Sequence, residues 1–187
     1  MKKSVATIVG LIIFICVCRV IPHLANFSPM ICVALFAGNI IQKRFAVAAV
    51  LLGMLLSDIL LAWVYHYPML GSWSFFTYTG LAAILLIGAR IAHLSGRFMP
   101  GLIAVLASNL GFWVWTNLGT WAFSGMYHVN FNGLITCYTA AIPFLQHSTM
   151  SAMVWYLVFL AGSVVVFTRS RGQTAFGGFK LLNEHTH

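Results

Sequence analysis

The sequence predicts an all-α integral membrane protein, a bundle of six transmembrane helices. Of its 187 residues, 61% are hydrophobic and only 6% are charged, and the mean hydropathy is +0.95. A soluble domain cannot bury that much apolar surface. Because a spanning helix needs about 20 residues, residues 1–168 have room for six spans with short connections. Residues 169–187 then form a tail with no periodicity of its own, which we expect to be mobile or to lie on the surface.

The first half of the chain holds three of the predicted spans. The first runs from about Ser4 to Val20 and ends at a polar turn bracketed by two prolines, which cannot continue the helix. The second, from about Met30 to Ile41, is short and rises only about 18 to 22 Å. It is therefore expected to be sunk in a locally thinned bilayer or to be partly re-entrant. The third runs from Phe45 to about His66 and carries Asp58.

The second half holds the remaining spans, at about Trp73–Ile91, Gly101–Phe123 and Met150–Phe167. Between the last two lies an apolar stretch, Gly133 to Gln146, which is too short to span the bilayer and too apolar to be a free loop. It predicts a short helical or re-entrant cap over one mouth of the bundle, hinged at Gly133 and Pro143.

The basic residues predict the orientation of the bundle. With six spans, nine of the ten Lys and Arg residues fall on one side. The positive-inside rule makes that side cytoplasmic, with both termini inside, in a multi-pass protein of the inner (cytoplasmic) membrane. The basic residues that give the net charge of +8 thus act as orientation signals. We expect lipid contacts and no nucleic-acid partner. The nine residues are Lys2, Lys3, Lys43, Arg44, Arg90, Arg97, Arg169, Arg171 and Lys180.

One acidic residue lies inside the predicted bundle. Asp58 is the only acid before residue 184, and a carboxylate at the bilayer centre costs from about 2.5 kcal/mol upward unless it has a partner. Arg19 and Asp58 both lie roughly 20 Å from the cytoplasmic edge, and Asn117 reaches about the same height. We therefore expect Arg19 to hold Asp58, as arginine can by two parallel hydrogen bonds. The spacing leaves open whether the pair is the floor of a ligand cavity or a structural ion pair.

The three outward connections contain no Lys or Arg and are rich in aromatic residues and histidines. This mixture suits a mostly apolar pocket with a few polar groups, lying above Arg19 and Asp58. An aromatic belt at the membrane interface, or capping roles, would explain each residue equally well when taken singly. The candidate ligand-binding residues in and below these connections are Asn26, His66, Trp73, Asn117 and Tyr127, together with Arg19 and Asp58.

The sequence gives no positive sign of an enzyme. It has no Gly-rich phosphate loop, no HExxH pair, no nucleophile elbow and no second membrane acid. The four cysteines form no CxxC pair, and the histidines have no metal-site spacing. We therefore expect no catalytic residues, no metal and no cofactor.

Four segments carry a resemblance to a known family: RVIPHLANFSPM, ALFAGNI, LLSDILL and GMYHVNFNGLITCYTAAIPF. They resemble an uncharacterised family of small bacterial membrane proteins over roughly residues 18–165, chiefly through the P-H-x-x-N-F-S-P turn and the S-D pair. That family is similar to the substrate-binding S-components of energy-coupling-factor (ECF) vitamin transporters. The similarity rests on six spans, chain length, both termini inside and the outward first, third and fifth loops.

The resemblance implies an S-component-like fold and uptake of a vitamin-like micronutrient captured from the outer face. It also implies a shared transmembrane coupling subunit energised by ATPases, with no hydrolysis by this chain. Two alternatives stay open. The chain could be a proton-coupled secondary carrier that uses Asp58, or a structural or assembly protein whose polar residues only join helices.

Overall fold

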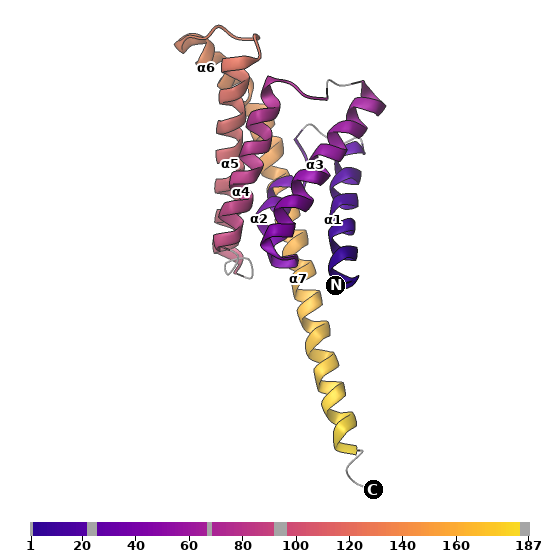
Figure 1. Ribbon diagram of the computed structural model, residues 1–187. Coiled ribbons are helices and arrows are strands. Elements are labelled where there is room, and N and C mark those ends of the chain that lie inside the picture. Colours follow the sequence, from indigo (N-terminus) through magenta and orange to yellow (C-terminus); the bar gives the residue numbers. More distant parts are fainter. Residues whose placement is uncertain (1, 22–25, 67–68, 92–96, 184–187) are drawn as a thin grey trace.

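The computed structural model describes residues 2–21, 26–66, 69–91 and 97–183, and the regular structure within these ranges is entirely helical (Figure 1). The described chain forms seven helices. They are α1 (Lys2–Val20), α2 (Met30–Ile40), α3 (Lys43–Tyr65), α4 (Ser72–Ile91), α5 (Phe98–Phe123), α6 (Phe131–Ala140) and α7 (Ile142–Asn183).

Four of these helices contain segments long and apolar enough to cross a membrane: Arg44–Tyr65, Trp73–Ile91, Phe98–Phe123 and Ile142–Ser163. A shorter apolar segment, Val5–Val20, lies in α1. Large apolar side chains cover the outside of the bundle, as where Trp63 is 78% exposed. Such a surface fits lipid rather than water, so the predicted all-α membrane class is supported. The predicted count of six spans exceeds the four helices that meet these criteria in the described chain.

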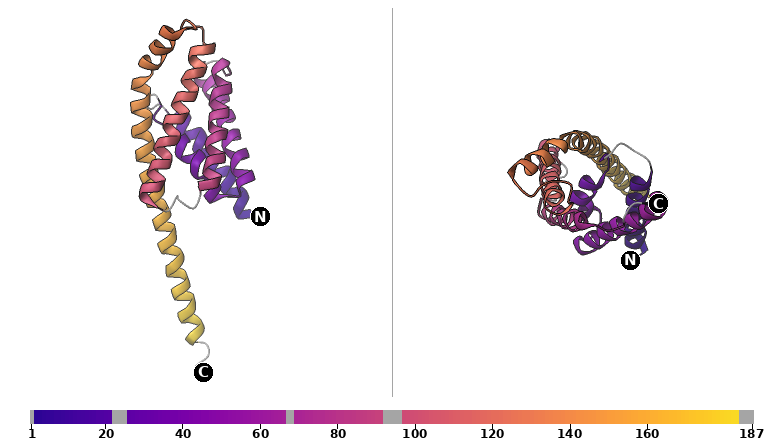
Figure 2. Two further views of the ribbon diagram at one scale, coloured as in Figure 1. Left: turned by 90° about the vertical axis from the view of Figure 1, so that its left-hand side faces the viewer. Right: turned by 90° about the horizontal axis from the view of Figure 1, so that it is seen from above.

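Five long helices form a ring around α2 (Figure 2). Around the ring α1 packs on α3, α3 on α4, α4 on α5 and α5 on α7. Phe14 of α1 and Trp155 of α7 close the circle, with their rings edge to face and the centroids 5.7 Å apart. Inside it, α2 contacts α3, α4, α5 and α7. Every residue from Met30 to Ala37 is buried, at most 8% exposed. The helix is apolar on all sides because all its sides face protein.

The shortness of α2, which the sequence predicted, divides the interior of the ring. Its 11 residues rise about 16 Å, which is too short to fill the whole ring. The helix lies in the half away from α6 (Figure 1). Close packing holds it there. A Cβ added at Gly88 of α4 would lie 2.1 Å from the carbonyl oxygen of Leu35. Glycine is therefore required at this position for α4 to approach the backbone of α2.

The structure corrects two predicted boundaries at the C-terminal end. The stretch from Gly133 to Gln146 is not one cap, because α6 ends at Ala140 and α7 begins at Ile142 rather than near Met150. Pro143 falls in the first turn of α7, where a missing N–H removes no helical hydrogen bond. The helix also continues to Asn183, although the sequence predicted that the last span would end near Phe167. No proline follows Pro143 to stop it.

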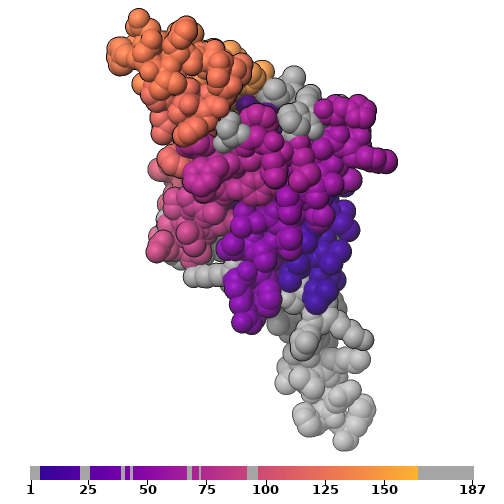
Figure 3. Space-filling view, turned by 45° about the horizontal axis from the view of Figure 1, so that its top comes forward, coloured from indigo at the N-terminus to yellow at the C-terminus, as the bar shows by residue number. Residues whose placement is uncertain are grey.

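The two ends of the bundle differ. The start of α1 and the end of α7 lie on the side opposite α6, and α7 extends well beyond the other helices there (Figure 1). At the other end, α6 and the turn before it project beyond the ends of the neighbouring helices (Figure 3). Asn130 caps α6, since its Oδ1 accepts a hydrogen bond of 2.8 Å from the N–H of Gly133. We call this side the α6 end.

Candidate functional site

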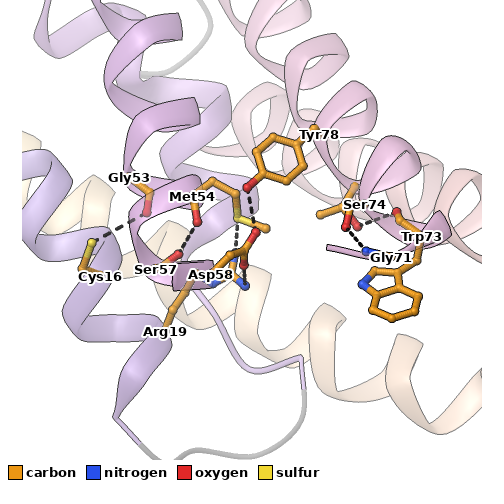
Figure 4. A network of polar contacts seen from close by, with 11 residues as sticks. Cys16, Arg19, Gly53, Met54, Ser57, Asp58, Gly71, Trp73, Ser74 and Tyr78 are labelled. Atoms are coloured by element: carbon orange, nitrogen blue, oxygen red, sulfur yellow. Dashed lines mark hydrogen bonds and ion pairs between the residues drawn. The ribbon is translucent and has the colours of Figure 1, made fainter. Parts of the chain in front are cut away.

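A polar network joins three helices inside the ring (Figure 4). The guanidinium of Arg19 in α1 donates a hydrogen bond of 2.7 Å to Oδ1 of Asp58 in α3, and it also contacts the sulfur of Met54. The hydroxyl of Tyr78 in α4 donates to the other carboxylate oxygen, Oδ2, at 2.7 Å. The side chains of Arg19 and Asp58 are only 18% and 15% exposed. The predicted pairing of these two residues is confirmed.

The geometry of the pair differs from the expected one. Arg19 reaches one carboxylate oxygen instead of both, and Tyr78 donates to the second. The sequence reasoning missed Tyr78, although a signal was present. The number of residues from Asp58 to the end of α3 is similar to the number from the start of α4 to Tyr78. Both therefore lie about 10 Å from the connection between the two helices, at the same depth.

A cavity of about 590 Å³ occupies the half of the ring next to the α6 end. The N-terminal end of α2 lies at its base, where Met30 and Ile31 contribute to the lining. Long helices supply the walls, with aromatic side chains, a few amides and hydroxyls, and the guanidinium of Arg19. The lining residues are Arg19, Asn26, Ser28, Met30, Ile31, Met54, Leu61, Thr77, Leu81, Asn109, Phe112, Trp113, Thr116, Asn117, Phe144 and Ser148.

A second, smaller cavity of about 330 Å³ lies beside the first. Asp58, Tyr78 and Trp73 line it, together with residues around the connection between α3 and α4. Four residues line both cavities: Arg19, Met54, Leu61 and Thr77. These four therefore form the partition between the two spaces. We refer to the two spaces as the large cavity and the small cavity.

The structure brings five of the seven predicted site residues to these cavities. Arg19, Asn26 and Asn117 line the large cavity, and Arg19, Asp58 and Trp73 line the small one. Asn117 shares the lining of the large cavity with Arg19, but its Nδ2 donates to the carbonyl of Trp113 at 2.8 Å and not to the charged pair.

The other two candidates lie elsewhere. His66 is exposed just after α3, in the left-handed conformation with φ 56°, and it lines neither cavity. Tyr127 belongs to the turn before α6 and is also absent from both linings. A helix-ending role accounts for His66. For every residue of the set, a ligand-binding role stays a prediction.

One face of α5 forms much of the large cavity, and the sequence reasoning found only part of it. Asn109, Phe112, Trp113, Thr116 and Asn117 recur at the three- and four-residue spacing that places side chains on one side of a helix. Asn109 also bridges helices, as its Nδ2 donates to the hydroxyl of Thr149 in α7 at 3.1 Å. Polar residues at helical spacing within an apolar span were the signal that could have identified this face.

Outside the cavities, α6 packs onto the end of α5. The thiol of Cys137 lies 3.6 Å from the carbonyl oxygen of Asn117 and is 1% exposed. Burial raises the pKa of this thiol, so it stays protonated and acts as a small packing residue. Within the described ranges, no three His, Cys, Asp or Glu side chains gather as they would around a metal ion.

The cavities can hold a molecule, since sites for small ligands range over about 300 to 1,000 Å³ and combine apolar walls with a few polar groups. Among the described residues that line the cavities, the charged ones are Arg19 and Asp58.

Comparisons with known proteins show the family of the chain, but not its function. No curated protein and no solved structure matches the chain. Residues 1–183 match a family of unknown function, DUF6580, and the chain belongs to this family.

Proposed function

We propose that this protein is the substrate-binding membrane subunit of an uptake system for a small, vitamin-like micronutrient, similar to an ECF S-component. The observation that carries the proposal is the large cavity. Its volume of about 590 Å³ lies within the range of small-molecule sites. Its walls combine Phe112, Trp113 and Phe144 with a small number of amides and hydroxyls. A protein that served only to join helices would have no need for a hollow of this size.

The topology proposed for this role has six crossings. Besides the four helices that meet the length criterion, α1 and the short α2 would each cross. The start of α1 and the end of α7 lie on one side (Figure 1), and the basic clusters of the sequence favour the cytoplasm for that side. The α6 end would then face outward in the bacterial inner membrane. A cysteine probe at Asn130 should react from outside, and a probe at Gln42 should not.

Energy for uptake would come from other subunits. Under the proposal, a shared ECF transmembrane coupling subunit with its ATPases binds this chain and drives release of the ligand inward.

One specific observation supports the alternative of a proton-coupled carrier: Asp58 lines the small cavity. Against it, Arg19 and Tyr78 already hold both carboxylate oxygens of Asp58 in a network that joins three helices.

Mass spectrometry of small molecules that stay bound through gentle purification tests the proposal. The large cavity is filled by Thr116→Trp, and the matched control is Val114→Trp, whose position on the same helix is 44% exposed on the outer surface. The wild type and the control should retain the same compound, and the filled variant should lose it. If the wild type retains nothing, or all three retain the same compound, a structural or assembly role is preferred. Proton-driven uptake in vesicles that Asp58→Asn abolishes would favour the carrier.

A further inference from the structure

The two cavities differ in the charge that lines them. Arg19 lines both, but Asp58 lines only the small cavity. Within the described lining, the large cavity therefore presents a cation and no anion. Arg19 and Asp58 form an ion pair that is neutral as a whole, but its positive end faces the large cavity and favours a negatively charged group there.

Arg19 also has unused hydrogen-bonding capacity. A guanidinium carries five N–H donors. Its contacts among the described residues are one oxygen of Asp58 and the sulfur of Met54. A thioether is only a weak acceptor. Since Asp58 keeps a second hydrogen bond from Tyr78, Arg19 can share its donors with a further acceptor without leaving the carboxylate unpartnered.

The start of α2 adds a second feature that attracts an anion. Pro29 precedes the helix and offers no side-chain cap, and the first N–H of α2 with an acceptor in the described chain is that of Val33. Met30 and Ile31, whose N–H groups come before it, line the large cavity. Ser28 lines the same cavity, and its hydroxyl oxygen is buried and has no hydrogen-bond partner among the described residues. Half-helices that begin inside a membrane protein commonly direct their positive ends at anionic groups of a substrate.

We propose that the large cavity takes a carboxylate-bearing small molecule with an aromatic or apolar body. The acid group binds Arg19, with the start of α2 and Ser28 contributing donors, and the body lies against Phe112, Trp113 and Phe144. A single arginine matches one carboxylate by its planar, two-pronged geometry. This inference rests on the proposed function and narrows its substrate class.

The test compares three probes that share one body. Indole-3-acetate is anionic, indole-3-acetamide is neutral, and tryptamine is cationic, so their binding to the purified protein isolates the effect of charge. We expect the acid to bind about tenfold or more tightly than the amide and the amine, as loss of a hydrogen bond to a charged group predicts. Calorimetric titration of the intact protein in mild detergent measures the three dissociation constants.

Variants assign that preference to Arg19. The double variant Arg19→Gln, Asp58→Asn removes both charges together, so no unpaired charge is left inside the bundle. It should bind the acid and the amide equally, whereas Arg44→Gln, which removes an exposed positive charge on α3, should keep the preference. A circular dichroism melt of each variant confirms that it is folded.

The proposal is overturned if the amide or the amine binds as tightly as the acid, if the preference survives in the double variant, or if none of the three probes binds. The proposed function fails separately. It fails when mass spectrometry finds no retained molecule. It stands without the acid subsite when the retained molecule is neutral or cationic and is lost in Thr116→Trp but kept in the double variant Arg19→Gln, Asp58→Asn.

Discussion

Inside one ring of helices, the half that α2 fills is packed, whereas the half next to the α6 end is hollow. In the packed half, Cys32, Val33, Ala34 and Leu35 are at most 1% exposed. In the hollow half, the same five helices surround cavities of about 590 and 330 Å³. The walls continue past the start of α2, so the difference comes from where that helix begins. A half-length helix inside full-length neighbours leaves a space at one end.

The two halves also differ in the polarity of their side chains. Next to α2 the contacts are apolar or between small groups, as where the thiol of Cys32 lies 3.4 Å from the carbonyl oxygen of Ala152. The hollow half contains the amides, several hydroxyls and Arg19. In the packed half, the side chains are those whose shapes fit closely together. In the hollow half, polar groups remain that can still form hydrogen bonds. Stability and the proposed binding should therefore depend on different halves, which mutations can separate.

The largest expected effect comes from breaking the charged pair between the two cavities. Arg19→Gln alone should destabilise the protein by about 3 to 5 kcal/mol, because it leaves Asp58 buried without its cation. The double variant Arg19→Gln, Asp58→Asn should lose less than the sum of the two single losses. The free energy of unfolding in detergent micelles measures each loss. Additive losses would show that the two residues do not interact.

Leucine truncation compares the two halves directly. Leu35→Ala in α2 should cost about 3 kcal/mol, since it leaves a void in close packing. Leu61→Ala, at the partition of the cavities, should cost about 1 kcal/mol because part of its surface already faces empty space. The same unfolding measurement applies, with Leu86→Ala, 57% exposed on the outer surface, as the control. Equal losses at Leu35 and Leu61 would contradict the division into halves.

The contact between α2 and α4 gives the next effect. Gly88→Ala should destabilise by about 2 kcal/mol, because its Cβ meets the backbone of Leu35, which cannot move aside as a flexible side chain would. Gly111→Ala on α5 is the matched control, as nothing lies within 4 Å of its added Cβ. That change should leave the melting temperature unchanged or raise it. If Gly88→Ala is as stable as the wild type, α2 is held less tightly than the structure indicates.

The smallest expected effect concerns access and not stability. Ser148 lines the large cavity, and Ser151, one turn further along α7, is fully buried and donates to the carbonyl of Ser28 at 3.0 Å. A small water-soluble thiol reagent should modify Ser148→Cys at least about tenfold faster than Ser151→Cys, because exposure governs thiol reactivity. Mass shifts above the wild-type background give the rates. Similar rates would show that the hollow half does not end at this turn.

Local features of the sequence determined the class of the protein and part of its interior. Apolar runs and basic clusters located α3, α4 and α5 to within about three residues, since hydrophobic length is a local property. Pro29 and the short apolar run after it predicted the brevity of α2. Depth along the helices, which follows from a fixed rise per residue, predicted that Arg19 and Asp58 meet.

Only the tertiary structure decided what surrounds those residues. Periodicity shows which face of a helix is apolar, but not which helix it will meet. It therefore could not place α2 inside a ring of the other five, assign Tyr78 to Asp58, or collect cavity residues from segments as distant as Asn26 and Ser148. It also missed the early start of α7, because an apolar stretch that lies beside the bundle has the same composition as one that lies across its end. The cavity exists because α2 begins halfway along neighbours that continue past its start, and that relation involves six helices at once.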